Sequence, residues 1–189
     1  MKVRQVLVLL FVVFTGFNAC KEDEKKGQTP TQVQEVQFEG IEEINQKLEK
    51  DPENPDLLYQ RANIYFQNKS FDDALGDISK AIRIDSTKAD YYITLADVYF
   101  FTKKPKEAVE ALSKSLEKEP GYIPAIMKLS EYYLYLGQYQ KAIDRANNVL
   151  EINPNFGGAY FLKGICYLDQ KDTARAIQNF QLAVDNDQE

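Results

Sequence analysis

The sequence has 189 residues, of which 44% are hydrophobic and 12% aromatic, enough for one domain with an ordinary core. Acidic residues outnumber basic ones by 29 to 23, and the net charge of -6 argues against nucleic acid as a partner. Histidine is absent, so histidine-based catalytic relays and histidine-containing zinc sites are excluded.

The first twenty residues have the pattern of a secretory signal peptide. Lys2 and Arg4 precede an apolar run from Val6 to Phe14, which corresponds to the charged region and short hydrophobic region of such a signal. A membrane-spanning helix needs ~20 apolar residues. Because the run is shorter than that, a cleaved signal is favoured over an uncleaved membrane anchor.

Residues 17–20, Phe-Asn-Ala-Cys, resemble the lipobox of bacterial lipoproteins, in which a small residue precedes a cysteine that becomes lipidated. Ala19 and Cys20 match this motif, whereas Phe17 and Asn18 replace its usual leucine and its usual serine or alanine. The resemblance implies that residues 1–20 are a lipoprotein signal peptide and that Cys20 carries acyl chains such as palmitate. It also implies a place in the bacterial cell envelope, as an outer membrane lipoprotein.

A polar segment follows the cysteine. Residues 21–24, Lys-Glu-Asp-Glu, resemble an acidic signal that directs some lipoproteins to the cell surface, although a solvated linker explains the same charges. Both interpretations stay open at this point. Residues 21–38 are rich in charged residues, glutamine and threonine, so we expect a flexible tether.

Beyond the tether the sequence repeats with a period of 34 residues. Three residue classes recur at this spacing in four consecutive units, which a generic helical bundle would not produce. They are the tyrosines Tyr65, Tyr99, Tyr133 and Tyr167, the alanines Ala74, Ala108, Ala142 and Ala176, and the small residues Ala62, Ala96, Ser130 and Gly164. This pattern resembles the tetratricopeptide-repeat (TPR) family, in which each unit is a pair of antiparallel helices.

The resemblance implies an all-α fold, a right-handed TPR solenoid in which residues 39–189 form one domain. About four helix–turn–helix repeats are expected, at about 55–88, 89–122, 123–156 and 157–189. Ile41, Ile44 and Leu48 form one apolar stripe before the first repeat. Residues 40–50 are therefore expected to add an N-terminal capping helix.

TPR proteins usually bind peptides in a concave groove lined by the first helix of each unit, and the family pattern assigns particular positions to this groove. The predicted groove residues are Tyr59, Asn63, Asp90, Asp97, Phe101, Lys128, Glu131 and Tyr135. Phe101 and Tyr135 are expected to be exposed, whereas Phe66 and Phe100 could equally belong to the core. Asp97 and Glu131 are expected to be rim charges that act mainly by steering association. The resemblance thus implies a protein or peptide partner with apolar and basic residues.

The first helix of the fourth unit is apolar nearly all round. Phe161, Leu162, Ile165 and Leu168 predict a surface for a partner or for a homo-oligomer, since no polar capping helix follows them before Glu189. Cys166 lies in the same helix and is expected to be a small buried hydrophobe rather than a reactive thiol.

Catalytic motifs are missing from the sequence. It has no glycine-rich phosphate loop or nucleophile elbow, and its paired carboxylates lie on solvated helix faces. We expect no enzymatic activity, catalytic residue, metal site or cofactor. The leading hypothesis is a membrane-anchored adaptor that binds a protein or peptide. The alternative is a structural subunit of an envelope assembly or secretion complex that docks through its apolar C-terminal repeat.

Overall fold

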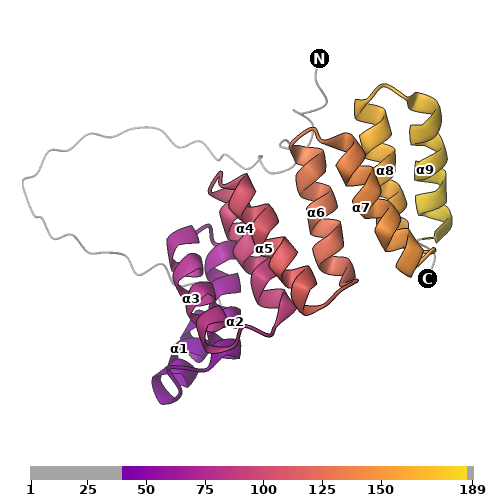
Figure 1. Cartoon of the computed structure of the whole chain (residues 1–189). Helices are drawn as coiled ribbons and strands as arrows, with labels where there is room; N and C mark the ends of the chain where they lie inside the picture. The colour runs from indigo at the N-terminus through magenta and orange to yellow at the C-terminus, as the bar shows by residue number, and fades with distance from the viewer. Residues whose placement is uncertain (1–39, 187–189) are drawn as a thin grey trace, which may run out of the picture. The chain divides into compact units, whose positions relative to one another are not determined.

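The computed structural model describes residues 40–186, and this part of the chain consists of helices joined by short turns, without a strand (Figure 1). The described helices are α1 Ile41–Lys50, α2 Pro55–Gln67, α3 Phe71–Ile84, α4 Ala89–Phe101, α5 Pro105–Lys118, α6 Ile123–Tyr135, α7 Tyr139–Ile152, α8 Gly157–Asp169 and α9 Thr173–Asn186. The predicted all-α fold, with four helix pairs after one leading helix, is confirmed.

The helix pairs keep the 34-residue register of the sequence. Their first helices begin at Pro55, Ala89, Ile123 and Gly157. The turn inside each pair is centred on a residue with a left-handed backbone, and these residues are Lys69 (φ 62), Lys103 (φ 62), Gly137 (φ 72) and Lys171 (φ 66). Glycine adopts this conformation without steric cost. The lysines, which do bear that cost, lie just beyond a helix C-terminus, where positive charge interacts favourably with the helix dipole.

Small side chains let the two helices of each pair approach closely. The alanines and the serine of the predicted small and alanine positions are at most 1% exposed. The Ser130 hydroxyl also donates to the carbonyl oxygen of Ala142 in the partner helix, at 2.6 Å. A Cβ added at Gly164 would lie 2.5 Å from a ring carbon of Phe180. The 34-residue recurrence of small residues is therefore a packing requirement.

The core continues from unit to unit. The second helix of each unit packs against the first helix of the next, as α3 against α4, α5 against α6 and α7 against α8. At the last of these contacts, Ile143 and Val149 of α7 share a buried cluster with Ala159, Leu162 and Cys166 of α8. Neighbouring units thus stabilise each other, as in other repeat proteins.

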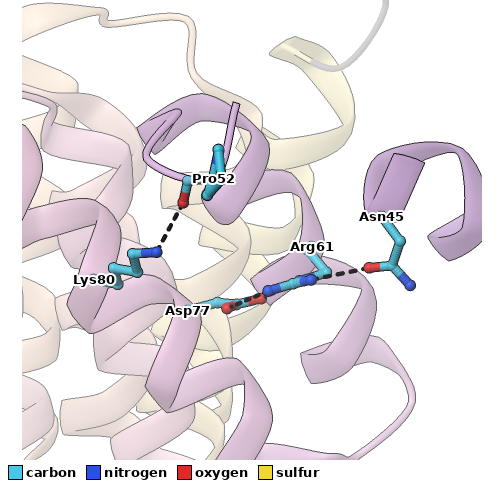
Figure 2. A network of polar contacts seen from close by, with 5 residues as sticks. All are labelled: Asn45, Pro52, Arg61, Asp77 and Lys80. Atoms are coloured by element: carbon cyan, nitrogen blue, oxygen red, sulfur yellow. Dashed lines mark hydrogen bonds and ion pairs between the residues drawn. The ribbon is translucent and has the colours of Figure 1, made fainter. Parts of the chain in front are cut away.

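The leading helix α1 closes the N-terminal end through its buried residues Ile41, Ile44 and Leu48, as predicted. Figure 2 shows a polar network beside this contact. The Arg61 guanidinium of α2 donates to both carboxylate oxygens of Asp77 in α3, at 2.6 and 2.9 Å, and to the amide oxygen of Asn45 in α1, at 2.9 Å.

The same network reaches the turn before α2, where the Lys80 ammonium donates to the carbonyl oxygen of Pro52 at 2.7 Å (Figure 2). Arg61 occupies the repeat position that Leu95 and Leu129 hold in the next two units. Polar contacts at this position thus attach α1 to the first unit. The two middle units have apolar residues at the same position.

The predicted signal peptide of residues 1–20, the lipid acceptor Cys20 and the tether of residues 21–38 lie outside the described residues. They stay predictions. Among the helices of residues 40–186, none combines the length and the apolar character needed to span a membrane.

Candidate binding surface on the first helices

The first helices of the four units lie side by side, since α2 contacts α4, α4 contacts α6 and α6 contacts α8. Helical spacing places the predicted binding residues of each helix on one side of it. We call the surface that these residues form the first-helix face. It comprises Tyr59 and Asn63 of α2, Asp90, Asp97 and Phe101 of α4, and Lys128, Glu131 and Tyr135 of α6.

Hydrogen bonds between tyrosine and aspartate join neighbouring first helices on this face. The Tyr91 hydroxyl of α4 donates to the Asp56 carboxylate of α2 at 2.5 Å, and the Tyr122 hydroxyl, just before α6, donates to Asp90 of α4. Burial and the bond to Asp56 raise the pKa of Tyr91, and the bond to Asp90 raises the pKa of Tyr122 to about 12. Both hydroxyls therefore remain protonated donors at neutral pH.

Asp97 is paired and largely buried, so it is not the rim charge that the sequence suggested. The Tyr132 hydroxyl donates to the Asp97 carboxylate at 2.5 Å, and the Lys128 ammonium lies 3.2 Å from the same oxygen. Lys128 also lies 3.7 Å from Glu131. Only 14% of the Asp97 side chain is exposed. Asp97 is aimed at the next helix, a direction that residue type alone does not reveal.

Tyr59 and Asn63 also contact the neighbouring helix. The ring centroid of Tyr59 lies 5.0 Å from that of Tyr91. The amide oxygen of Asn63 accepts a hydrogen bond from the Thr94 hydroxyl at 2.9 Å, and Thr94 is only 5% exposed. Both residues therefore help to align α2 with α4 in addition to any contact with a ligand.

A continuous band of aromatic rings crosses the first-helix face, with neighbouring ring centroids 3.9 to 6.1 Å apart. We call it the aromatic band, and its members are Phe66, Phe100, Phe101, Tyr132 and Tyr135 of the first helices together with Phe71, the first residue of α3. Phe66 and Phe100, left open by the sequence, are both half-buried. Phe100 stacks on the buried ring of Tyr132 at 3.9 Å, so it links the core to the surface.

Two rings of the band are exposed, as the sequence predicted. Phe101 is 59% and Tyr135 65% exposed. Phe101 touches the rings of Phe66, Phe71 and Phe100, which restrict its orientation. The arrangement offers a preorganised apolar surface of the kind that takes up an aliphatic or aromatic side chain.

The C-terminal unit differs in part from its prediction. Leu162 is only 4% exposed and belongs to the core that α8 forms with α7, so its assignment to a partner surface is wrong. A helix covered on one side by its neighbour cannot expose its whole apolar circumference. Ile165 is half-buried, whereas Phe161 and Leu168 are 54% and 40% exposed.

Sequence reasoning missed two exposed residues of α9, Ile177 at 63% and Val184 at 58%. The 34-residue period could have found them, because it shows that both stand where earlier units contact the next first helix. They extend the exposed apolar surface from α8 to α9.

Reactive groups are few in the described part of the chain. Residues 40–186 hold no group of three or more acidic or cysteine side chains placed to bind a metal ion. Cys166 is fully buried, and burial raises the pKa of its thiol to about 12. The thiol is therefore protonated at neutral pH and shielded from solvent.

Comparison with known proteins assigns the repeat to a family. One tetratricopeptide-repeat model matches residues 39–89 and 127–189, and a second tetratricopeptide-repeat model matches residues 89–121. The chain belongs to the TPR family. The matched ranges contain all or part of every described helix of this TPR domain.

Several solved structures are similar to this TPR chain. A crystal structure of MamA is 26% identical with a TM-score of 0.68, covering 79% of this chain and 88% of that one. The pilF protein of Pseudomonas aeruginosa is 22% identical with a TM-score of 0.64, covering 70% and 60%. YrrB, described as a TPR protein with an unusual peptide-binding site, is 20% identical with a TM-score of 0.62, covering 79% and 80%. The latter two similarities show the fold alone. The comparison with curated proteins gave no match.

Proposed function

We propose that the chain is a non-catalytic scaffold that binds a protein or peptide on its first-helix face and is held at a membrane by lipid on Cys20. The aromatic band supports the binding role. Phe101 and Tyr135 are largely exposed, yet contacts with other rings hold both in place. Covering them costs little side-chain entropy, and aromatic anchors of this kind dominate binding energy at protein interfaces.

The charges beside the band favour a basic partner. Asp90 and Glu131 are exposed carboxylates on α4 and α6, and Lys128, which lies between Asp97 and Glu131, is the one basic residue beside these three acids on the first-helix face. A fitting peptide places an apolar side chain against Phe101 and Tyr135. Its flanking lysine or arginine residues then face Asp90 and Glu131.

Peptides selected from a random library against the purified chain test this proposal. They should share an apolar residue flanked by lysine or arginine. Replacing Phe101 and Tyr135 together by alanine should weaken binding of a selected peptide by about 2 kcal/mol, roughly 30-fold. Ile152→Ala is the matched control, since Ile152 is 50% exposed but lies on the second helix α7. Equal binding by the double variant and the wild type would refute the role of the band.

Kinetics separate anchoring from steering. Asp90→Asn combined with Glu131→Gln should slow association and flatten its dependence on salt, because exposed charges act mainly on the association rate. Asp72→Asn combined with Asp73→Asn is the control, since both of these acids are exposed on α3. The control should leave both rates unchanged.

The alternative, a structural subunit of an envelope assembly that docks through its C-terminal unit, predicts the reverse result. Phe161→Ala would then abolish capture of an envelope partner, while the variant of Phe101 and Tyr135 would bind as wild type does. The exposure of Phe161 and Leu168 favours this alternative.

Membrane attachment rests on the lipobox resemblance around Ala19 and Cys20. Cys20→Ser should abolish labelling by a fatty acid analogue and release the protein from membranes. Cys166→Ser is the control, since that cysteine is buried. Labelling of the Cys20 variant at the wild-type level would exclude this lipid site.

We further propose an outer membrane location, with residues 21–24 as a candidate signal for surface display. Protease added to intact cells separates the two sides of that membrane. It should digest the protein if the chain faces outward. Protection in intact cells, together with digestion after the outer membrane is permeabilised, would place the chain on the periplasmic side.

A further inference from the structure

Four apolar side chains are exposed together in the last helix pair. Phe161 and Leu168 lie seven residues apart on α8, and Ile177 and Val184 lie seven residues apart on α9. That spacing puts each pair on one side of its helix. Their exposed fractions are 54%, 40%, 63% and 58%. We call these four residues the C-terminal face.

The repeat itself shows what kind of surface this is. One period earlier, the four residues correspond to Met127 and Leu134 of α6 and to Ile143 and Leu150 of α7. Ile143 is 4% exposed and belongs to the cluster that α7 forms with α8, and the other three pack against that cluster. The C-terminal face is thus an uncovered copy of the contact between units, and it is shaped to receive a TPR helix.

The opposite end of the array cannot supply that helix. The outer side of α1 carries charged or polar exposed side chains, namely Glu42, Glu43, Gln46, Lys47, Glu49 and Lys50. No large hydrophobic residue of α1 is exposed. Head-to-tail stacking of copies would therefore bury charges against apolar side chains, which is unfavourable.

The described part of the last unit, residues 157–186, carries three basic and three acidic residues, although the chain as a whole is acidic. On α9 the only charged residues are Arg175, which pairs with Asp172 at 2.5 Å, and Asp185, which accepts a hydrogen bond from Gln181 at 2.9 Å. On α8 they are Lys163 and Asp169, one of each sign. Within residues 157–186, two copies can therefore meet without a net like-charge repulsion.

We propose that the C-terminal face binds the same face of a second copy, forming a closed dimer with two-fold symmetry. A self-complementary patch gives such an isologous contact, and the charged outer side of α1 prevents further growth. In the dimer, α8 and α9 of one copy cover Ile177 and Val184 of the other. Ile177 and Val184 of α9 lie outside the first-helix face, so variants of these two residues test the dimer without changing the residues proposed to bind a partner.

Sedimentation equilibrium of the full chain in a density-matched detergent tests the dimer. Wild type should sediment as monomer and dimer only, without larger species. Ile177→Asp should raise the dimer dissociation constant by at least about tenfold, because a carboxylate would be buried in the contact. Ile84→Asp is the matched control, an isoleucine 42% exposed on α3, and should dimerise like wild type. Val184→Asp is the second interface variant, and circular dichroism verifies that each variant is folded.

Any of four results would overturn the inference. Wild type could stay monomeric at tens of micromolar, it could form open-ended oligomers, or folded Ile177→Asp and Val184→Asp variants could both dimerise like wild type. Dimer loss in the variant of Phe101 and Tyr135 would also overturn it, by placing the contact on the first-helix face. Peptide binding by Ile177→Asp should remain at the wild-type level, so a failure of the dimer is distinguishable from a failure of the binding function.

Discussion

The two ends of the array accommodate a basic residue at the same repeat position in opposite ways. In the first unit, Arg61 pairs with Asp77 and donates to Asn45. In the fourth unit, Lys163 takes this position and has no ion-pair partner within residues 40–186. Its ammonium lies 5.7 Å from the centroid of the Tyr160 ring, and burial lowers its pKa.

The difference shows that a helix packed against a terminal unit decides whether a basic residue there finds hydrogen-bond partners. Part of the Arg61 hydrogen bonding comes from α1, which also turns a charged side to solvent. Among residues 40–186, no helix packs on the side of α8 and α9 that faces away from α7, and Lys163 of α8 is half-buried without a carboxylate partner. The N-terminal helix α1 turns a polar side to solvent, whereas the last helix pair exposes the apolar residues by which internal units contact each other.

The largest effect on stability is expected at the N-terminal end, from removing Arg61, the partner of Asp77. Arg61→Leu should lower the free energy of unfolding by about 2 kcal/mol, since hydrogen bonds to a charged group are lost and half-buried Asp77 is left unpaired. Adding Asp77→Ala should recover most of the lost stability. The double variant then has leucine and alanine at these two repeat positions, as the second unit does with Leu95 and Ala111. Urea denaturation of both variants measures the effect. No recovery in the double variant would mean that the unpaired Asp77 carboxylate is not the source of the lost stability.

The second-largest effect on stability is expected from substituting a glycine in the first unit and a glycine in the fourth unit. Gly164→Ser should destabilise by about 1 to 2 kcal/mol, because its Cβ would meet the Phe180 ring. Adding Phe180→Ala recreates the pair that the third unit carries as Ser130 and Ala146, so the combined cost should be below the sum of the single costs. In the first unit a Cβ at Gly76 meets no atom within 4 Å.

Gly76→Ala should therefore stabilise the protein by about 0.5 to 1 kcal/mol through helix propensity. Denaturation curves of the two glycine variants, recorded side by side, should move in opposite directions. A shift of the same sign in both would contradict the difference in packing.

The smallest effect is expected at Lys163. Lys163→Leu should raise the free energy of unfolding by about 1 kcal/mol, because it replaces a half-buried charge without a carboxylate partner by the leucine of the middle units. Lys106→Leu, at an exposed position of α5, is the control and should change little. Unchanged or lower stability of the Lys163 variant would show that the contact with Tyr160 compensates for burial.

The advantage of this variant should depend on pH. Because burial lowers the pKa of Lys163, the folded state binds fewer protons there than the unfolded state. Wild-type stability therefore rises as the pH increases through the folded pKa toward 10.5, the ordinary value, and the variant lacks this gain. The difference between the two proteins should shrink between neutral pH and pH 10.5.

Much of the candidate surface could be predicted from the sequence, but two of its features could not. Helical spacing and the family pattern anticipated the exposure of Phe101 and Tyr135. They did not reveal that Asp97 bonds to Tyr132, because that bond joins residues 35 apart on neighbouring helices and depends on side-chain direction. Nor did they show that Leu162 is buried, since an apolar helix does not indicate which of its sides the neighbouring helix covers.

The sequence by itself determined the helices and their order, because the 34-residue period encodes where small and bulky residues must meet. Each such rule is local, concerning one helix pair and the turn within it. Only the tertiary structure decided which acids remain free, which rings are exposed and how the two ends differ. These properties depend on contacts between neighbouring units. Such contacts join side chains about one repeat apart in the sequence, so the pattern within one unit does not specify them.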